Sequence, residues 1–262
     1  NILFMFSFFK SPGKNKQAYT IAFYNLENLF DTKKDPLILD DDFTPNGNKH
    51  WNYKRYKRKI NKLSSVISQI GTERSYFSPA IVGVAEVEND TVLSDLISTI
   101  NLKNEHYGVV HYDSPDERGI DVALLYKKEL FELLHSETFT LYIENEYGER
   151  DFTRDILLVK GNLNGELMHV LINHWPSRRS GEDVSEEKRI KAAELVTSIV
   201  HKINEETTNA KIIVMGDFND NPTNISVKKY LVNNTFYNPM ERLIDTGNGT
   251  LNHKNKWHLF DQ

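Results

Sequence analysis

The sequence of 262 residues contains no cysteine. Disulfide bonds, thiol catalysis and thiolate-bound zinc are therefore excluded, although this absence does not identify a compartment. Basic residues are not in excess either, because the formal net charge is −5 and the pI is about 6.0. Proteins that bind nucleic acid mainly by non-specific electrostatics are usually more basic. Any phosphate ligand must therefore be held by a local cationic cluster or by a metal ion.

Long apolar runs and flexible linkers are also missing. The apolar run Ile2–Phe9 is too short to span a bilayer. Its length suits the core of a signal peptide, which would make the protein exported or membrane-anchored. The alternative is an apolar segment packed on the domain of a cytoplasmic protein, since no basic leading region precedes the run. Without repeats or Pro- and Gly-rich linkers, we expect a lead-in over residues 1–18 and a single domain over 19–262.

The most informative stretch is Lys211–Pro222, KIIVMGDFNDNP. Its first residues, Lys211–Met215, are mostly β-branched or apolar and predict a short buried strand that ends at Gly216. Asp217 and Asn219 follow at a spacing of two. Such residues commonly form a polar turn after a strand, but enzymes also present catalytic groups in this way. This stretch alone leaves both interpretations open.

Two other predicted strands also end in polar residues. Tyr19–Tyr24 leads into Asn25 and Glu27, and the apolar run Ala80–Ala85 leads into Glu86. A carboxylate at the end of a fully buried strand is costly unless it is paired or bound to a metal. We therefore favour a functional role for Glu86.

A fourth predicted strand ends in cationic residues. Arg154–Val159 and Leu167–Asn173 predict a β-hairpin, and its second strand leads into His174, Arg178 and Arg179. A lone histidine would more often be structural. One histidine with two arginines at a strand end, however, forms a compact site suited to a phosphate group.

The sequence also predicts four helices, three between these strands and a short one after the last strand. They cover Asn52–Ile70, a segment capped by Asp90, a segment from Asp183 to about Asn204 with a capping box, and Ser226–Val232. The first helix carries a basic face with aromatic residues nearby, which would suit nucleic-acid binding. We favour the simpler interpretation that this face is solvated.

Polar groups at equivalent ends of adjacent strands converge into one cleft, so we expect one site. Its acids are Glu27, Glu86 and Asp217, its amides are Asn25, Asn173 and Asn219, and its cations are His174, Arg178 and Arg179. Carboxylates and amides without cysteine suit Mg²⁺, with Mn²⁺ as the alternative. A hard cation beside a His and Arg cluster equips a protein for attack of water on a phosphate ester.

Five segments resemble, in order, the successive motifs of the endonuclease/exonuclease/phosphatase superfamily. They are FYNLENLF (23–30), VGVAEVEN (82–89), NHWPSRRSG (173–181), MGDFNDNP (215–222) and LFDQ (259–262). The resemblance implies an α/β fold of the deoxyribonuclease-I type. This fold is a four-layered α/β/β/α sandwich of two packed, mostly antiparallel sheets flanked by helices.

The resemblance also implies a metal-dependent phosphoester hydrolase, with a phosphodiesterase or nuclease as our first expectation. The alternatives are a phosphomonoesterase acting on inositol, sugar or lipid phosphates, and a non-catalytic module that kept the fold. We expect a monomer without a stable protein partner. Its substrate would be a phosphate ester, with nucleic acid among the candidates.

The resemblance assigns roles by position. Glu86 would be the principal metal ligand, with Glu27 near the same ion. Asn25 would hold phosphate or orient its neighbours. Asp217 would position or deprotonate the attacking water, and Asn219 would contact the scissile phosphate.

The remaining predicted roles concern phosphate. The resemblance implies that His174 binds or protonates the phosphate and that Asp261 orients a catalytic histidine. From their residue types, Asn173, Arg178 and Arg179 are predicted to bind phosphate.

The family places that catalytic histidine in a Ser-Asp-His element downstream of the Asp261 position. This sequence ends at Gln262, and neither His253 nor His258 matches the motif. We therefore expect a fragment of an active protein, with loss of activity as the alternative.

Overall fold

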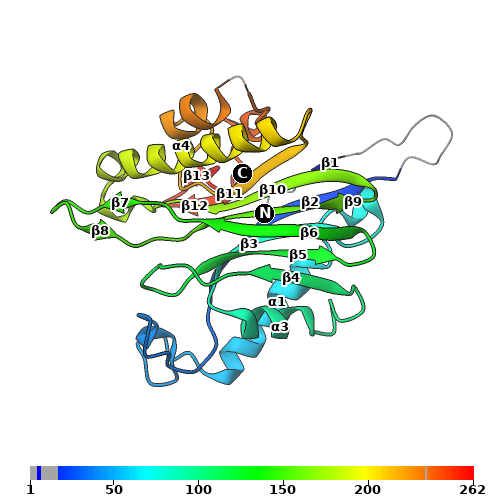
Figure 1. The fold of residues 1–262 in the computed structure, drawn as a ribbon. Helices are drawn as coiled ribbons and strands as arrows, with labels where there is room; N and C mark the ends of the chain where they lie inside the picture. Colours follow the sequence, from blue (N-terminus) through cyan, green and yellow to red (C-terminus); the bar gives the residue numbers. More distant parts are fainter. Residues whose placement is uncertain (1–4, 7–16, 234) are drawn as a thin grey trace. The chain divides into compact units, whose positions relative to one another are not determined.

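The computed structural model describes residues 5–6, 17–233 and 235–262. The chain divides into two compact units, which we call the N-terminal unit (Leu3–Glu132) and the C-terminal unit (Leu133–Gln262). Each unit contains a main β-sheet with helices packed on it (Figure 1). The expected α/β class, with two sheets flanked by helices, is confirmed.

The sheet of the N-terminal unit has the strand order β1-β2-β3-β5-β4. Its strands are β1 (Met5–Phe6), β2 (Tyr19–Leu29), β3 (Ile81–Val87), β4 (Tyr107–His111) and β5 (Asp121–Lys127). β2 and β3 are parallel, whereas the other pairs are antiparallel. The carboxyl ends of β2 and β3 therefore lie at the same edge of this sheet, as the motif positions require.

Helices α1 (Tyr53–Ile67) and α3 (Asp90–Ile97) cover one face of this sheet (Figure 1). Alternate apolar residues of β3 and β5 pack against the apolar side of both helices, which explains why the predicted periodicities are found here. Two short helices, η1 (Asp41–Phe43) and α2 (Thr72–Ser75), complete the unit. The predicted N-cap of α3 was wrong by one residue, because the Asn89 side chain accepts the hydrogen bond from Val92 N.

The sheet of the C-terminal unit has the order β11-β10-β9-β6. Its strands are β6 (Phe131–Phe139, which begins two residues before the unit boundary), β9 (Ile156–Leu163), β10 (Glu166–His174) and β11 (Ile212–Asp217). β9 and β10 form the predicted antiparallel hairpin, turning at Asn164 and Gly165 with φ values of 49° and 84°. β10 and β11 are parallel, so His174 and Asp217 are register partners at one edge.

Helix α4 (Glu182–Glu206) packs on this sheet together with η3 (Ser226–Val232), a π-helix (Figure 1). The predicted capping box does not form. The helix begins at Glu182 after Gly181, whose φ is 102° and which offers no side-chain cap. The smaller elements are η2 (Arg178–Ser180), η4 (Pro239–Leu243), β7 (Ile143–Glu144), β8 (Arg150–Asp151), β12 (Leu251–His253) and β13 (Lys256–His258).

The last residues of the chain run beside β11. Gly216 and Gln262 exchange two backbone hydrogen bonds of 2.8 and 2.9 Å, and Phe218 N donates to Phe260 O at 2.9 Å. Most of Ile2–Phe9, the possible signal-peptide core, lies outside the described residues, which include only Met5–Phe6 of it. Among the described residues, no helix has the length and apolar content needed to cross a membrane.

Candidate functional site

In the N-terminal unit, the structure brings Asn25 and Glu86 together at the edge shared by β2 and β3. Asn25 Nδ2 donates a hydrogen bond to Glu86 Oε1 at 3.3 Å, and Asn25 Oδ1 accepts one from Glu27 N at 2.8 Å. These residues lie within the strands, not in loops after them as the sequence suggested. Their oxygen donors are those that a hard divalent cation takes in proteins. The donor set therefore fits Mg²⁺ or Mn²⁺.

Bulges and left-handed backbone conformations change the direction of the side chains at this edge. The register shifts between Asn25 and Leu29 in β2 and between Ala85 and Val87 in β3. Glu27 and Glu86 have positive φ values of 55° and 60°. A bulge redirects side chains beside active sites, and a left-handed conformation costs a non-glycine residue on the order of 1 kcal/mol or more. Such strain is typical of functional positions.

Lys59 on α1 supplies a positive charge to this edge. Its Nζ donates a hydrogen bond to the backbone oxygen of Glu27. Burial lowers the pKa of Lys59, while the charges of Glu27 and Glu86 oppose the shift, so both carboxylates lie near the same ammonium group. Lys59 belongs to the basic face of the predicted Asn52–Ile70 helix, which was expected to be solvated. Its position three residues after the buried Tyr56 could have placed it beside the apolar face.

In the C-terminal unit, the parallel strands β10 and β11 bring His174 and Asp217 side by side, since they are register partners. Asp217 Oδ1 accepts a hydrogen bond from Asn219 N at 2.9 Å, and Asn219 Nδ2 donates to Trp175 O at 3.0 Å. The structure thus ties the Asp217 carboxylate to the backbone of Asn219, and the Asn219 carboxamide to the backbone after the end of β10. Ligands commonly bind at the carboxyl ends of parallel strands.

Asn173 makes its side-chain hydrogen bonds inside the C-terminal unit. Its side chain is fully buried, and its Nδ2 donates to Leu171 O at 3.4 Å and Met215 O at 3.3 Å. Its Oδ1 accepts a hydrogen bond from Trp175 Nε1 at 3.1 Å. These bonds engage the Asn173 amide inside the unit, where it ties β10 to β11 and leaves no donor directed at a phosphate.

Gly216 allows this close packing. A Cβ atom at Gly216 would lie 2.3 Å from the backbone oxygen of Asn173, so only glycine fits there. The glycine before Asp217 in the fourth motif therefore has a packing reason.

The other predicted residues of this unit are in different environments. Arg178 is half-buried and contacts Asn219, whereas Arg179 is exposed. Asp261 forms an antiparallel bridge with Asp217, and its backbone N–H donates to Thr250 Oγ1 at 3.1 Å. Backbone pairing therefore places Asp261 beside the strand end that carries Asp217.

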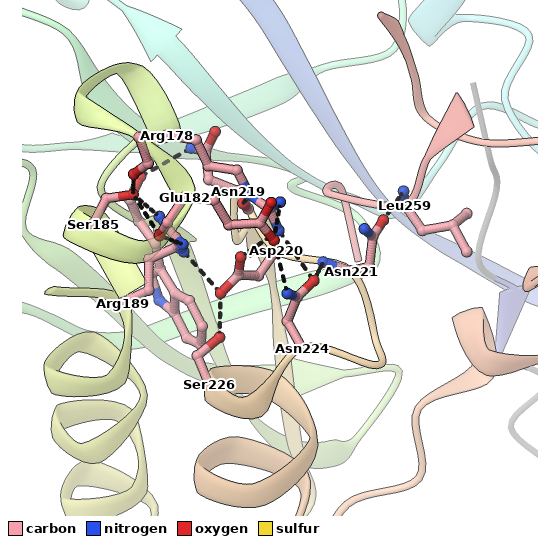
Figure 2. Close-up of polar contacts among 12 residues, drawn as sticks. Arg178, Glu182, Ser185, Arg189, Asn219, Asp220, Asn221, Asn224, Ser226 and Leu259 are labelled. Carbon is pink, nitrogen blue, oxygen red and sulfur yellow. Dashed lines mark hydrogen bonds and ion pairs between the residues drawn. The ribbon is translucent and has the colours of Figure 1, made fainter. Parts of the chain in front are cut away.

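The sequence did not indicate that Asp220 is the buried ion-pair partner of Arg178. Asp220 lies in the polar, turn-forming segment after Gly216, yet its side chain is fully buried and paired with Arg178 and Arg189 (Figure 2). Arg189 could have been noticed, because it falls on the face of α4 that also carries the buried Ala192 and Ala193. A charged residue on an apolar face requires a buried partner.

A second group of potential metal ligands, His111, Asp113 and Asp121, lies in the N-terminal unit, with ligand atoms within 4.8 Å of one another. Both ring nitrogens of His111 already face carboxylates, Asp90 at 3.0 Å and Asp121 at 3.2 Å. Burial lowers the pKa of His111, but hydrogen bonding and charge from Asp121 and the charge of Asp90 outweigh it, so the pKa is raised. His111 is therefore held between Asp90 and Asp121, and both of its ring nitrogens have carboxylate partners.

Comparison with known proteins agrees with the motif resemblance. A sequence model described as "Endonuclease/Exonuclease/phosphatase family" matches residues 20–262, which include most of both units. No curated protein matches the chain.

Several solved structures are similar in fold. A β-hairpin deletion mutant of beta toxin from Staphylococcus aureus is 16% identical with a TM-score of 0.56, over 83% of this chain and 73% of that chain. An endonuclease/exonuclease/phosphatase family protein from Bacteroides thetaiotaomicron is 17% identical with a TM-score of 0.54, over 82% and 68%. D. rerio TDP2, humanized by 14 mutations, is 15% identical with a TM-score of 0.52 over 80% of this chain.

The chain spans 66% of the length of that TDP2 chain, slightly less than two thirds. Identities below one fifth show a shared fold and carry no statement about substrates.

Proposed function

Because this chain belongs to the endonuclease/exonuclease/phosphatase family, a superfamily of metal-dependent phosphoester hydrolases, we propose that it hydrolyses phosphodiesters with Mg²⁺ as its metal. Nucleic acid is the first substrate class that we would test, and the protein would act as a monomer. One observation carries the proposal. The Asp217 carboxylate is held by Asn219 N beside His174 at the end of a parallel strand pair.

The N-terminal unit would hold the metal. The carboxylate of Glu86, oriented by Asn25 Nδ2, would be the principal ligand, with Glu27 near the same ion. A bound divalent cation withdraws charge from phosphoryl oxygens and stabilises the negative charge that develops in the transition state. Lys59 would offset part of the negative charge of the two carboxylates when no metal is bound, since its ammonium group lies near both.

The C-terminal unit would handle water and phosphate. The Asp217 carboxylate would orient the attacking water and accept its proton, which is the role of a general base. Asn219 uses one amide hydrogen on Trp175 O, and its second would donate to a phosphoryl oxygen. His174 would donate a proton to a phosphate oxygen, while the exposed Arg179 would attract the anionic substrate. Asp261 would orient a histidine, as in the family pattern.

A substrate panel tests the proposal. Purified protein is assayed with and without Mg²⁺ on plasmid DNA, abasic duplex, bis(p-nitrophenyl) phosphate, inositol phosphates and sphingomyelin. We expect Mg²⁺-dependent cleavage of plasmid or of the aryl diester, and about a 10²- to 10⁴-fold lower kcat for Asp217→Asn. Lys191→Ala, which removes a partly exposed side chain that pairs with Glu187 on α4, is the matched control and should keep full activity.

Release of inorganic phosphate alone would replace the proposal with a phosphomonoesterase. No metal-dependent turnover on any substrate would favour a non-catalytic module.

A further inference from the structure

Four residues of the C-terminal unit form what we call the buried ion cluster: Arg178, Arg189, Asp220 and Ser226 (Figure 2). The side chains of Asp220 and Arg189 are fully buried. Arg189 Nε lies 2.7 Å from Asp220 Oδ2, and Arg178 Nη2 lies 2.5 Å from Asp220 Oδ1. Ser226 Oγ donates a further hydrogen bond to Asp220 Oδ2. One carboxylate is therefore held by two guanidinium groups and a hydroxyl.

Stability alone does not explain such a cluster. Removing charges from water is costly, and well-packed apolar residues of similar volume often stabilise a protein as well or better. The cluster is, however, directly connected to the loop that follows β11. Asp220 comes one residue after Asn219 and three after Asp217, so fixing its side chain fixes the backbone of the loop.

Arg178 makes the second connection to this loop. Its Nε donates to the backbone oxygen of Asn219 at 2.7 Å, while the Asn219 N–H donates to Asp217 Oδ1 at 2.9 Å. Both sides of Asn219 are thus held, one by the guanidinium group and the other by the Asp217 carboxylate. Asn219 has a φ of 51°, a left-handed conformation that asparagine tolerates but that needs such support.

The donors of Arg178 are occupied by these and two further partners (Figure 2). Nη1 lies 2.6 Å from Glu182 Oε1, and Nη2 also donates to Asn224 Oδ1 at 3.0 Å. The same Asn224 Oδ1 accepts a hydrogen bond from Asn221 N at 2.8 Å, so it fastens the end of the loop. A guanidinium group with three engaged nitrogens in a fixed plane is suited to holding a loop, which a lysine cannot imitate.

We propose that Arg178 is a positioning residue, in place of the phosphate ligand suggested by its sequence position. With Asp220 and Arg189 it holds the loop so that Asp217 and Asn219 keep their orientation. This inference rests on the proposed function, because it names the support of the residues assigned to water and phosphate.

Kinetics of Arg178→Lys and Arg178→Ala on bis(p-nitrophenyl) phosphate separate the two roles. A positioning role lowers kcat by about 10- to 100-fold with little change in KM, because misplaced groups lose transition-state contacts. A phosphate ligand would instead raise KM, as we expect for Arg179→Ala. Added guanidinium should partly restore kcat of Arg178→Ala. Arg242→Ala, at an exposed arginine in η4 of the same unit, is the matched control and should not change either constant.

A second readout does not depend on turnover. In two-dimensional amide NMR spectra, the Asn219 signal should shift or broaden in Arg178→Lys and stay in place in Arg242→Ala. An unchanged Asn219 signal, or a rise in KM with kcat unchanged, would overturn the inference. An inactive wild-type protein would overturn the proposed function, and the NMR result would still decide whether Arg178 positions the loop.

Discussion

The two units hold their candidate site residues in different ways. In the N-terminal unit, Glu27 and Glu86 are directed by bulges and left-handed backbone conformations. In the C-terminal unit, the loop that follows Asp217 and carries Asn219 is anchored through the buried Asp220. Under the proposed function, the carboxylates of the N-terminal unit would bind the metal, and their direction would be set mainly by the backbone. The loop of the C-terminal unit would align water and phosphate, and its direction is set by a dense side-chain network.

Removing the Asp220 carboxylate should produce the largest change in stability. Asp220→Ala leaves Arg189 fully buried without its carboxylate, and breaking a buried ion pair from one side costs about 3–5 kcal/mol. We expect a loss of this size in the free energy of unfolding, measured by urea titration.

Asp151→Ala is the control, because it removes a pair between Lys188 and Asp151 in which both side chains keep solvent contact. It should cost at most about 1 kcal/mol. Equal losses for both variants would show that the buried ion cluster does not anchor the C-terminal unit.

Relieving the backbone strain at Glu86 should raise the free energy of unfolding, by less than the loss expected for Asp220→Ala. Glycine adopts the φ of 60° found at Glu86 without the steric cost that other residues pay. We expect Glu86→Gly to be more stable than Glu86→Ala by about 1 kcal/mol, measured by urea titration, although neither variant should bind metal. The alanine variant is the matched control, since both remove the carboxylate but only glycine relieves the backbone. A more stable alanine variant would argue against strain at this position.

The smallest expected effects are on the pH dependence of stability. The buried side chains of His111 and His169 should contribute to it with opposite sign. The pKa of His111 is raised, because Asp121 and Asp90 outweigh burial, so its stabilising contribution is complete below its ordinary pKa of 6.5. That contribution is lost as the pH rises through the folded-state pKa. Burial lowers the pKa of His169, so the folded state disfavours its protonation and stability falls as the pH drops below 6.5.

Urea titrations at pH 5.5 and pH 8 check this contrast. His111→Gln should lose more stability at pH 5.5 than at pH 8, whereas His169→Gln should weaken the loss that the wild-type protein shows at low pH. The same pH response in both variants would contradict the assigned environments.

The sequence predicted the strands and the residues at their ends because both follow local rules. Apolar runs such as Ala80–Ala85 can only be buried, and the polar residues after them mark the sheet edge. The parallel pairing of β10 with β11, which places His174 beside Asp217, agrees with the order of the motifs.

The sequence did not predict features that depend on tertiary partners. Nothing in the neighbours of Glu86 shows that its φ is positive, since bulges arise from pairing with other strands. The sequence also does not show that the Asn173 amide is hydrogen-bonded to Leu171, Met215 and Trp175. Arg178 was assigned by residue type, and only its partners show that its guanidinium group is engaged.

The central claim is that Glu86 and Asp217 both serve a metal-dependent hydrolysis. The most direct test measures initial rates on bis(p-nitrophenyl) phosphate across a Mg²⁺ titration for the wild-type protein, Glu86→Gln and Asp217→Asn. We expect wild-type activity that vanishes with EDTA. Glu86→Gln should need far more Mg²⁺, and Asp217→Asn should lose about 10²-fold or more in kcat at saturating metal. Activity that persists in EDTA, or that survives both substitutions, would contradict the claim.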